Sequence, residues 1–144
     1  MRILIDADGC PVVDIACIVA KSTGTECIIL CDTSHMFSKD GAKTITVSKG
    51  ADSVDFALVN MLQKGDIVIT QDYGLAAMCL ARNAISINQD GMVYSDQNID
   101  ALLLARHNAK KIRNAGGRLK GPSKRTQSQN EAFCEKLQKT ISEN

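Results

Sequence analysis

The 144-residue chain is long enough for one domain with a sizeable core, and its 44% hydrophobic and 23% charged residues are ordinary for a globular protein. No apolar run approaches the ~20 residues that a membrane span needs, and two aspartates interrupt the apolar N-terminus. We therefore expect a cytoplasmic protein with no signal peptide and no membrane partner. With no Trp, two Tyr and three Phe, the composition argues against a nucleic-acid surface built from stacked aromatic rings.

The net charge of +1 conceals two parts of opposite sign. Residues 1–100 hold seven Lys and Arg against thirteen Asp and Glu, whereas residues 101–144 hold ten against three. An acidic body followed by a basic segment suits a metal site together with a polyanion partner such as RNA. The alternative is a solvated helix face followed by a basic loop. The six cysteines form no Cys-x-x-Cys motif and both histidines lie far from any cysteine pair, so no zinc site is indicated.

The first third of the chain predicts three strands and one helix. A short apolar run at residues 3–5 predicts a buried strand, and apolar residues at helical spacing predict a helix over 12–22. The run CIILC at 27–31 predicts a second buried strand, and the β-branched residues 44–47 predict a third. The polar residues 32–41 between these two strands read as a loop.

The middle of the chain continues the alternation of helices and strands. An apolar stripe predicts a helix over 50–62, with Asp52 as its N-cap and Asp55 one turn further in. The following elements are expected as a buried strand (67–70), a helix (75–81), a strand (84–87) and a short hairpin arm (92–95).

The C-terminal part predicts two helices separated by a basic loop. Asp96 or Asn98 can cap a helix over 99–115, and Gly116-Gly117 ends it. Residues 118–129 read as a loop that is disordered without its partner, and 130–141 read as a final amphipathic helix. The whole alternation predicts an α/β fold with a mostly parallel central sheet flanked by helices. Residues 1–115 form its main α/β part, and 116–144 add a basic loop and a C-terminal helix to the same domain.

Acidic residues occur where this fold would bring them together. Asp6 and Asp8 follow the first strand, Asp52 and Asp55 open a helix, and Asp72 follows a later strand. Because parallel strands end at one edge of a sheet, Asp6 and Asp72 can converge if their strands are near neighbours. Clustered carboxylates repel unless cations lie between them, and their oxygens suit Mg²⁺ or Mn²⁺. For any single aspartate, a turn or a helix cap remains the alternative.

Other residues would support such a site. Thr70 can hydrogen-bond a metal ligand or its water, and a bound metal could activate a water for attack on a phosphodiester. The basic segment would hold the phosphate backbone of a nucleic acid. The candidate phosphate contacts are Arg106, Lys110, Arg113, Arg118, Lys120 and Arg125.

Three stretches resemble the YaiI/YqxD family (DUF188, UPF0178), which is similar to PIN-type nuclease domains: IDADGCPV from Ile5, GADSVDFALV from Gly50, and GDIVITQDYGLAAMCLARNAISIN from Gly65. The resemblance extends into the tail, at Arg106, Arg113, Gly117, Gly121-Pro122 and Phe133. A PIN domain places acids after its first strand, on a helix, and after a strand in a Thr-x-Asp context. The matching residues are Asp6, Asp52 or Asp55, and Asp72, with Asp8 as an additional acid of the family.

The chain departs from this pattern at two points. Gly74 stands where the family usually has Pro, and a fourth PIN acid is not clear, because Asp90 is better explained as a turn residue. The resemblance implies a metal-dependent ribonuclease or related phosphodiesterase, in which Asp6, Asp8 and Asp72 are catalytic. In that reading Asp6, Asp72, Asp52 and Asp55 hold the metal.

Two other functions fit parts of the sequence. Ile3 to Gly9 also resembles the Asp-x-Asp-Gly motif of haloacid-dehalogenase-type phosphatases, with Asp6 as nucleophile and Asp8 as general acid. Against it, Gly65-Asp66 precedes its strand instead of following it, and the chain is short for that fold. The second alternative is a non-catalytic RNA-binding or regulatory protein, which would bind polyanions even after loss of Asp6 or Asp72.

Overall fold

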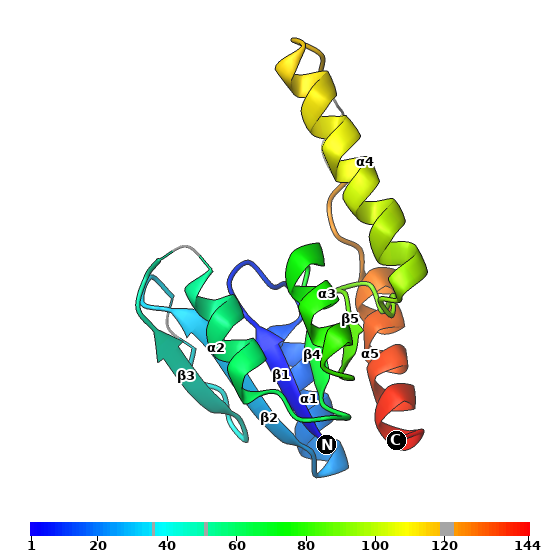
Figure 1. Cartoon of the computed structure of the whole chain (residues 1–144). Coiled ribbons are helices and arrows are strands. Elements are labelled where there is room, and N and C mark those ends of the chain that lie inside the picture. Colours follow the sequence, from blue (N-terminus) through cyan, green and yellow to red (C-terminus); the bar gives the residue numbers. More distant parts are fainter. Residues whose placement is uncertain (36, 51, 119–122) are drawn as a thin grey trace.

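The computed structural model describes residues 1–35, 37–50, 52–118 and 123–144 (Figure 1). Five strands form one wholly parallel sheet in the order β3-β2-β1-β4-β5. The strands are β1 (Arg2–Asp6), β2 (Glu26–Asp32), β3 (Lys43–Val47), β4 (Ile67–Ile69) and β5 (Ile85–Ile87). The helices are α1 (Val13–Thr23), α2 (Ser53–Met61), α3 (Tyr73–Ala81), α4 (Asp96–Asn114) and α5 (Gln127–Ser142). The predicted α/β class with a parallel sheet flanked by helices is confirmed.

Side chains alternate along β1 between two hydrophobic cores, as a strand covered on both faces requires. Ile3 and Ile5 pack with residues of α1 and α5, while Leu4 packs with residues of α2 and α3. Phe133 and Leu137 of α5 are fully buried against the α1 face. The C-terminal helix is therefore part of the same hydrophobic core as the N-terminal strand.

The strand order places a crevice beside β1. The chain runs outward from β1 through β2 to β3, then returns to the other side of β1 to form β4 and β5. In doubly wound sheets, ligands bind at the carboxyl ends of the strands, at the point where the order reverses. Here that point lies between β1 and β4, which pair in register from Ile3 with Ile67 to Ile5 with Ile69.

Helix α4 projects away from the rest of the molecule (Figure 1). Only Ile99, near its start, is buried. Its N-cap is Ser95, whose side chain forms a reciprocal capping box with Asn98, so neither predicted cap residue occupies the cap position. The predicted hairpin arm is present as an isolated antiparallel bridge between Ile87 and Val93.

Two other helix starts differ from the sequence prediction. Asp52 occupies the N-cap position of α2, as predicted, but its backbone is left-handed (φ 61°) and its side chain makes no capping hydrogen bond. Helix α5 begins at Gln127 under a capping box between Thr126 and Gln129, earlier than predicted. The loop before it is correspondingly shorter, and residues 119–122 lie outside the described residues. No helix in the described ranges is both long and apolar enough to cross a membrane.

Candidate active site

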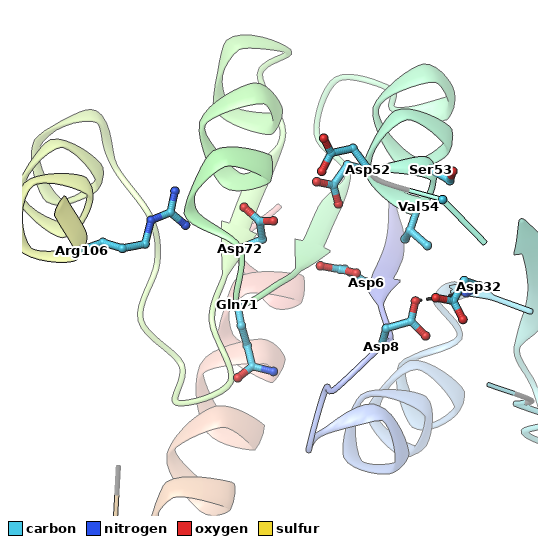
Figure 2. A pocket seen from close by; sticks show the side chains of 11 residues that line it. Asp6, Asp8, Asp32, Asp52, Ser53, Val54, Gln71, Asp72 and Arg106 are labelled. Atoms are coloured by element: carbon cyan, nitrogen blue, oxygen red, sulfur yellow. Dashed lines mark hydrogen bonds between the residues drawn. The ribbon is translucent and has the colours of Figure 1, made fainter. Parts of the chain in front are cut away.

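An open cleft of about 430 Å³ lies at the carboxyl ends of the central strands (Figure 2). Its chemistry is dominated by carboxylates, which come from three strand ends and from the start of α2. The acidic residues that line it are Asp6, Asp8, Asp32, Asp52, Asp55 and Asp72. The remaining lining residues are Gly50, Ser53, Val54, Gln71 and Arg106. The structure thus brings together all five aspartates that the sequence singled out, and adds Asp32.

Thr70 connects the two central aspartates. Its fully buried hydroxyl donates a hydrogen bond of 2.8 Å to Asp6 Oδ2 and accepts one of 3.0 Å from the backbone N–H of Asp72. The carboxylate of Asp72 also caps α3, because its Oδ1 accepts a hydrogen bond of 3.1 Å from the Leu75 N–H. Thr70 lies where it was expected, beside a candidate ligand, and Asp72 combines the capping role with a place in the cleft.

Burial and mutual repulsion perturb the acids of the cleft. Desolvation raises the pKa of Asp6, as do the charges of Asp72 and Asp8, although the Thr70 hydrogen bond opposes the rise. The pKa of Asp55 is raised to about 6 by desolvation and then by Asp72, Asp6 and Asp52. Asp52 itself is exposed at the rim. The cleft therefore concentrates more negative charge than its surroundings neutralise.

Asp8 belongs to a second group of side chains within the cleft. Its Oδ2 accepts a hydrogen bond of 3.1 Å from the Asp32 N–H, and its Oδ1 lies 2.8 Å from Nδ1 of His35. Sequence reasoning missed both Asp32 and His35. The sequence carries a signal for Asp32, because this acid directly follows the apolar run CIILC, just as Asp6 directly follows the apolar residues 3–5. His35 carries no such signal, since only the fold of the following turn brings it to Asp8.

The predicted phosphate-binding residues differ in where the structure places them. Arg106 is the single cation among the described lining residues, and its guanidinium carbon lies 5.7 Å from the centre of the Tyr73 ring. It extends from α4 toward the side of the cleft that holds Asp72 (Figure 2). Lys110, Arg113 and Arg118 are exposed, the first two on the projecting part of α4. Lys120 lies outside the described residues.

Arg125 is already engaged within the protein. Its Nη1 lies 2.7 Å from Asp90 Oδ1, its Nε donates to Asn130 Oδ1 at 2.6 Å, and its Nη2 donates to the carbonyl of Gln89. It thus ties the start of α5 to the turn after β5. A phosphate would have to displace this network, so Arg125 differs from Lys110 and Arg113, which form no ion pair with the residues that the structure describes. Asp90 is held in the turn, as expected.

The chemistry of another set of donors suits a hard divalent cation, although Asp6, Asp72 and Asp55 do not offer three ligand atoms within 4.8 Å of one another, as Asp8, Asp32 and His35 do. Carboxylate oxygens from Asp6, Asp72 and Asp55 face one cleft, and burial with mutual repulsion raises the pKa values of two of them. A cation among them would relieve this repulsion. Oxygen ligands with open positions for water are the usual surroundings of Mg²⁺ and Mn²⁺ in proteins.

The fold and the cleft define a doubly wound α/β protein with an acidic site at the topological switch point. Residues 4–143 match the model of a family described as uncharacterized BCR, YaiI/YqxD family (DUF188), and the chain belongs to this family. It is 51% identical to a UPF0178 protein of Exiguobacterium sibiricum over 99% of this chain and 98% of that protein. It is 53% identical to a UPF0178 protein of Ruminiclostridium cellulolyticum, over 92% of this chain and 87% of the relative. No solved structure matches the chain, so the resemblance to PIN-type nuclease domains stays a prediction from the sequence.

Proposed function

We propose that the protein is a divalent-metal-dependent phosphodiesterase that cleaves RNA. The observation that carries the proposal is the convergence of six aspartates on one cleft, with Arg106 on its wall. The exposed helix α4 leads away from the same cleft, and its residues 101–114 carry four Lys and Arg and no acid. Carboxylates repel the phosphates of a nucleic acid. A metal ion bound between carboxylates and phosphate would remove this repulsion, which explains why an acidic cleft lies beside a basic helix.

The residues of the cleft would have different roles in catalysis. Asp6 and Asp72 would be the principal metal ligands, and Asp55 and Asp52 would support them from α2. A Mg²⁺ or Mn²⁺ ion held there would supply a bound water of lowered pKa and positive charge to offset that of a phosphodiester. Thr70 fixes the orientation of the Asp6 carboxylate through its hydrogen bond.

The cations position the substrate. Arg106 can bind a phosphate oxygen with its guanidinium fork at the edge of the acidic group. Beyond it, Lys110, Lys111 and Arg113 lie in the last turns of α4, where they also suit the helix dipole. These contacts carry no sequence information, so they fix the strand without selecting its bases.

The phosphatase alternative has less support in the structure. Asp66, the acid nearest to its expected later motif, is 1% exposed and lies before β4, at the opposite end of the strand from the cleft. It is held there by an ion pair of 2.7 Å with Arg2. The lining residues that the structure describes include no lysine. The non-catalytic RNA-binding alternative keeps the same cations and differs only in turnover.

Cleavage of a 5′-labelled single-stranded RNA tests the proposal. We expect cleavage with Mn²⁺ or Mg²⁺, none with EDTA, and loss of cleavage in Asp72→Asn and Asp6→Asn. Asp100→Asn is the matched control, because it removes an exposed carboxylate of α4 outside the cleft. RNA binding measured in parallel separates the alternatives. Tight binding without turnover in the wild type would support the binding protein, and hydrolysis of a phosphomonoester abolished by Asp6→Asn would support the phosphatase.

A further inference from the structure

We propose that Asp8, Asp32 and His35 form a second cation site in the cleft, suited to a divalent transition ion such as Mn²⁺ or Zn²⁺. This site is distinct from the Asp6, Asp72 and Asp55 group described above. It stands whether or not the protein cleaves phosphodiesters, because it concerns binding of the ion alone. It also gives Asp8 a role that the pattern of PIN acids does not supply.

The three side chains offer ligand atoms at metal-site spacing. One nitrogen of His35 and one oxygen each of Asp8 and Asp32 all lie within 4.8 Å of one another. His35 Nδ1 is 2.8 Å from Asp8 Oδ1 and 3.5 Å from Asp32 Oδ1. Ligands at about 2.0–2.2 Å from a common ion lie roughly 3–3.6 Å apart, so small side-chain adjustments suffice to place an ion among them.

A buried oxygen in this group lacks a hydrogen-bond donor. Asp8 Oδ1 is buried and accepts no hydrogen bond from the described residues. His35 Nδ1 lies close to it, but not in line to donate a proton. A buried carboxylate oxygen without a hydrogen-bond donor is costly, because it has lost its water and faces only the Nδ1 of His35. A metal ion bound by both Asp8 Oδ1 and His35 Nδ1 would give the buried oxygen a partner. It would also explain why these two atoms lie so close together.

The surrounding backbone holds the three residues in place. Asp8 Oδ2 accepts the Asp32 N–H at 3.1 Å, which joins the end of β1 to the end of β2. Asp32 Oδ1 accepts the Ser34 N–H at 2.8 Å and also the Ser34 hydroxyl. The His35 N–H donates to the Asp32 carbonyl at 3.3 Å. Such outer contacts orient ligands in metal sites and reduce the rearrangement needed on binding.

The mixed ligand set favours particular ions. An imidazole nitrogen with two carboxylates suits Zn²⁺ and Mn²⁺ better than Mg²⁺, which prefers oxygen ligands alone. The two groups in the cleft therefore differ in ligand chemistry, because the Asp6, Asp72 and Asp55 group offers only oxygen. The rival explanation is that a protonated His35 serves as a counter-ion to the two carboxylates without any metal.

The chain contains two histidines, which makes a direct test simple. Side-chain ¹⁵N NMR of the full-length protein follows both imidazole rings during titration with Zn²⁺. We expect the His35 Nδ1 resonance to shift on binding of the first equivalents, while the exposed His107 on α4 stays unchanged.

Variants assign the bound ion to these residues. His35→Gln and Asp8→Asn should each weaken Zn²⁺ binding at least tenfold in calorimetry, whereas His107→Gln and Asp72→Asn should leave the His35 site intact. Asn at position 8 can still accept the Asp32 N–H, and the thermal midpoint checks that each variant folds.

Unchanged Zn²⁺ stoichiometry and affinity in His35→Gln, or ring signals of His35 that respond no earlier than those of His107, would overturn the proposal in favour of the ion pair. Loss of RNA cleavage in Asp72→Asn with a normal His35 response would separate this site from the proposed nuclease chemistry.

Discussion

The Thr70 hydroxyl donates its hydrogen bond to Asp6 across the join between β4 and β1, at 2.8 Å. The same hydroxyl accepts the Asp72 N–H at 3.0 Å, so one buried side chain sets the relative position of two strand-end acids. The sequence explains this placement, because the buried residues 67–69 form β4 and Thr70 is the first residue after the strand, at the edge of the sheet. Thr70 therefore fixes the positions of the candidate metal ligands Asp6 and Asp72 relative to the sheet.

Thr70→Val tests this relationship, because valine keeps the shape and removes the hydroxyl. We expect a loss of about 1–3 kcal/mol in the free energy of unfolding, since a buried N–H and a carboxylate oxygen lose their partner. The Thr70 hydrogen bond lowers the pKa of Asp6, so its removal should raise that pKa further. Urea unfolding and ¹³C carboxyl titration measure the two effects.

Thr140→Val is the matched control for that change. Thr140 is also buried, but its hydroxyl donates at 2.7 Å to the Lys136 carbonyl within α5. This control should leave the titration of Asp6 and the affinity for Mn²⁺ unchanged. If both valine variants bind Mn²⁺ equally, Thr70 does not organise the metal ligands.

Asp55 makes the stability of the metal-free protein depend on pH. Its pKa in the folded protein is about 6, above the ordinary value of 3.8, so folding favours its protonated form. This contribution is fully present below pH about 4 and is lost as the pH rises through about 6. In EDTA, the free energy of unfolding should therefore fall, through the contribution of Asp55, as the pH rises from about 4 to about 6.

Asp55→Asn should remove this part of the pH dependence, because asparagine does not titrate. Addition of Mn²⁺ to the wild type should reduce it as well, since a nearby cation stabilises the ionised carboxylate. Urea unfolding from pH 4 to 7, with EDTA or with Mn²⁺, checks both expectations. Equal slopes for the wild type and Asp55→Asn in EDTA would show that Asp55 is not perturbed by the cleft.

Most of the fold could be predicted from hydrophobic pattern alone. The buried runs of the central strands and the alternation of strands with helices are local signals, and they survive in the structure. Helix caps were less predictable. Asp52 is a favourable cap residue by type, yet its left-handed backbone turns its side chain from the helix start toward the cleft rim. Ser95 was overlooked because two acceptable caps follow it within three residues.

The aspartates of the cleft were predictable where they follow a strand or open the helix α2. Asp6 and Asp72 come together because β1 and β4 are neighbours, which the strand order decides and local sequence does not. Asp32 shares their pattern, and the register that pairs Asp6 with Leu30 carries β2 two residues further to reach Asp8. The partner of Arg125 could not be foreseen, because Asp90 lies 35 residues away in sequence.

Arg125 should contribute to stability more than to binding of nucleic acid. Arg125→Ala removes the ion pair with Asp90 and the contacts to Asn130 and Gln89. We expect a loss of about 1–2 kcal/mol in the free energy of unfolding and no change in RNA affinity beyond that of Lys124→Ala. Urea unfolding and fluorescence anisotropy compare the two variants. A larger loss of RNA affinity in Arg125→Ala, with stability unchanged, would restore Arg125 as a phosphate contact.

Asp66 provides a carboxylate whose role is structural. It accepts hydrogen bonds from the Arg2 backbone at 3.1 Å and from the Gln63 N–H at 2.9 Å, beside its ion pair with the Arg2 guanidinium. Asp66→Asn leaves the largely buried Arg2 charge without its partner, so we expect destabilisation of about 3 kcal/mol. Calorimetric affinity for Mn²⁺, measured below the unfolding temperature, should not change. Loss of Mn²⁺ binding in the folded variant would contradict the assignment of the metal to the opposite end of the strands.

The projecting end of α4 should determine the salt dependence of RNA binding. Lys110, Lys111 and Arg113 are exposed there, and each phosphate that a cation neutralises contributes about 0.7 to the slope of log K against log salt for a single strand. Replacing all three with alanine should therefore reduce the magnitude of that slope by about 2. The control replaces three exposed cations elsewhere, Lys64, Arg82 and Lys139, and should leave the slope nearly unchanged. Anisotropy titrations across KCl concentrations measure both, and equal slopes for the two triple variants would show that RNA does not follow α4.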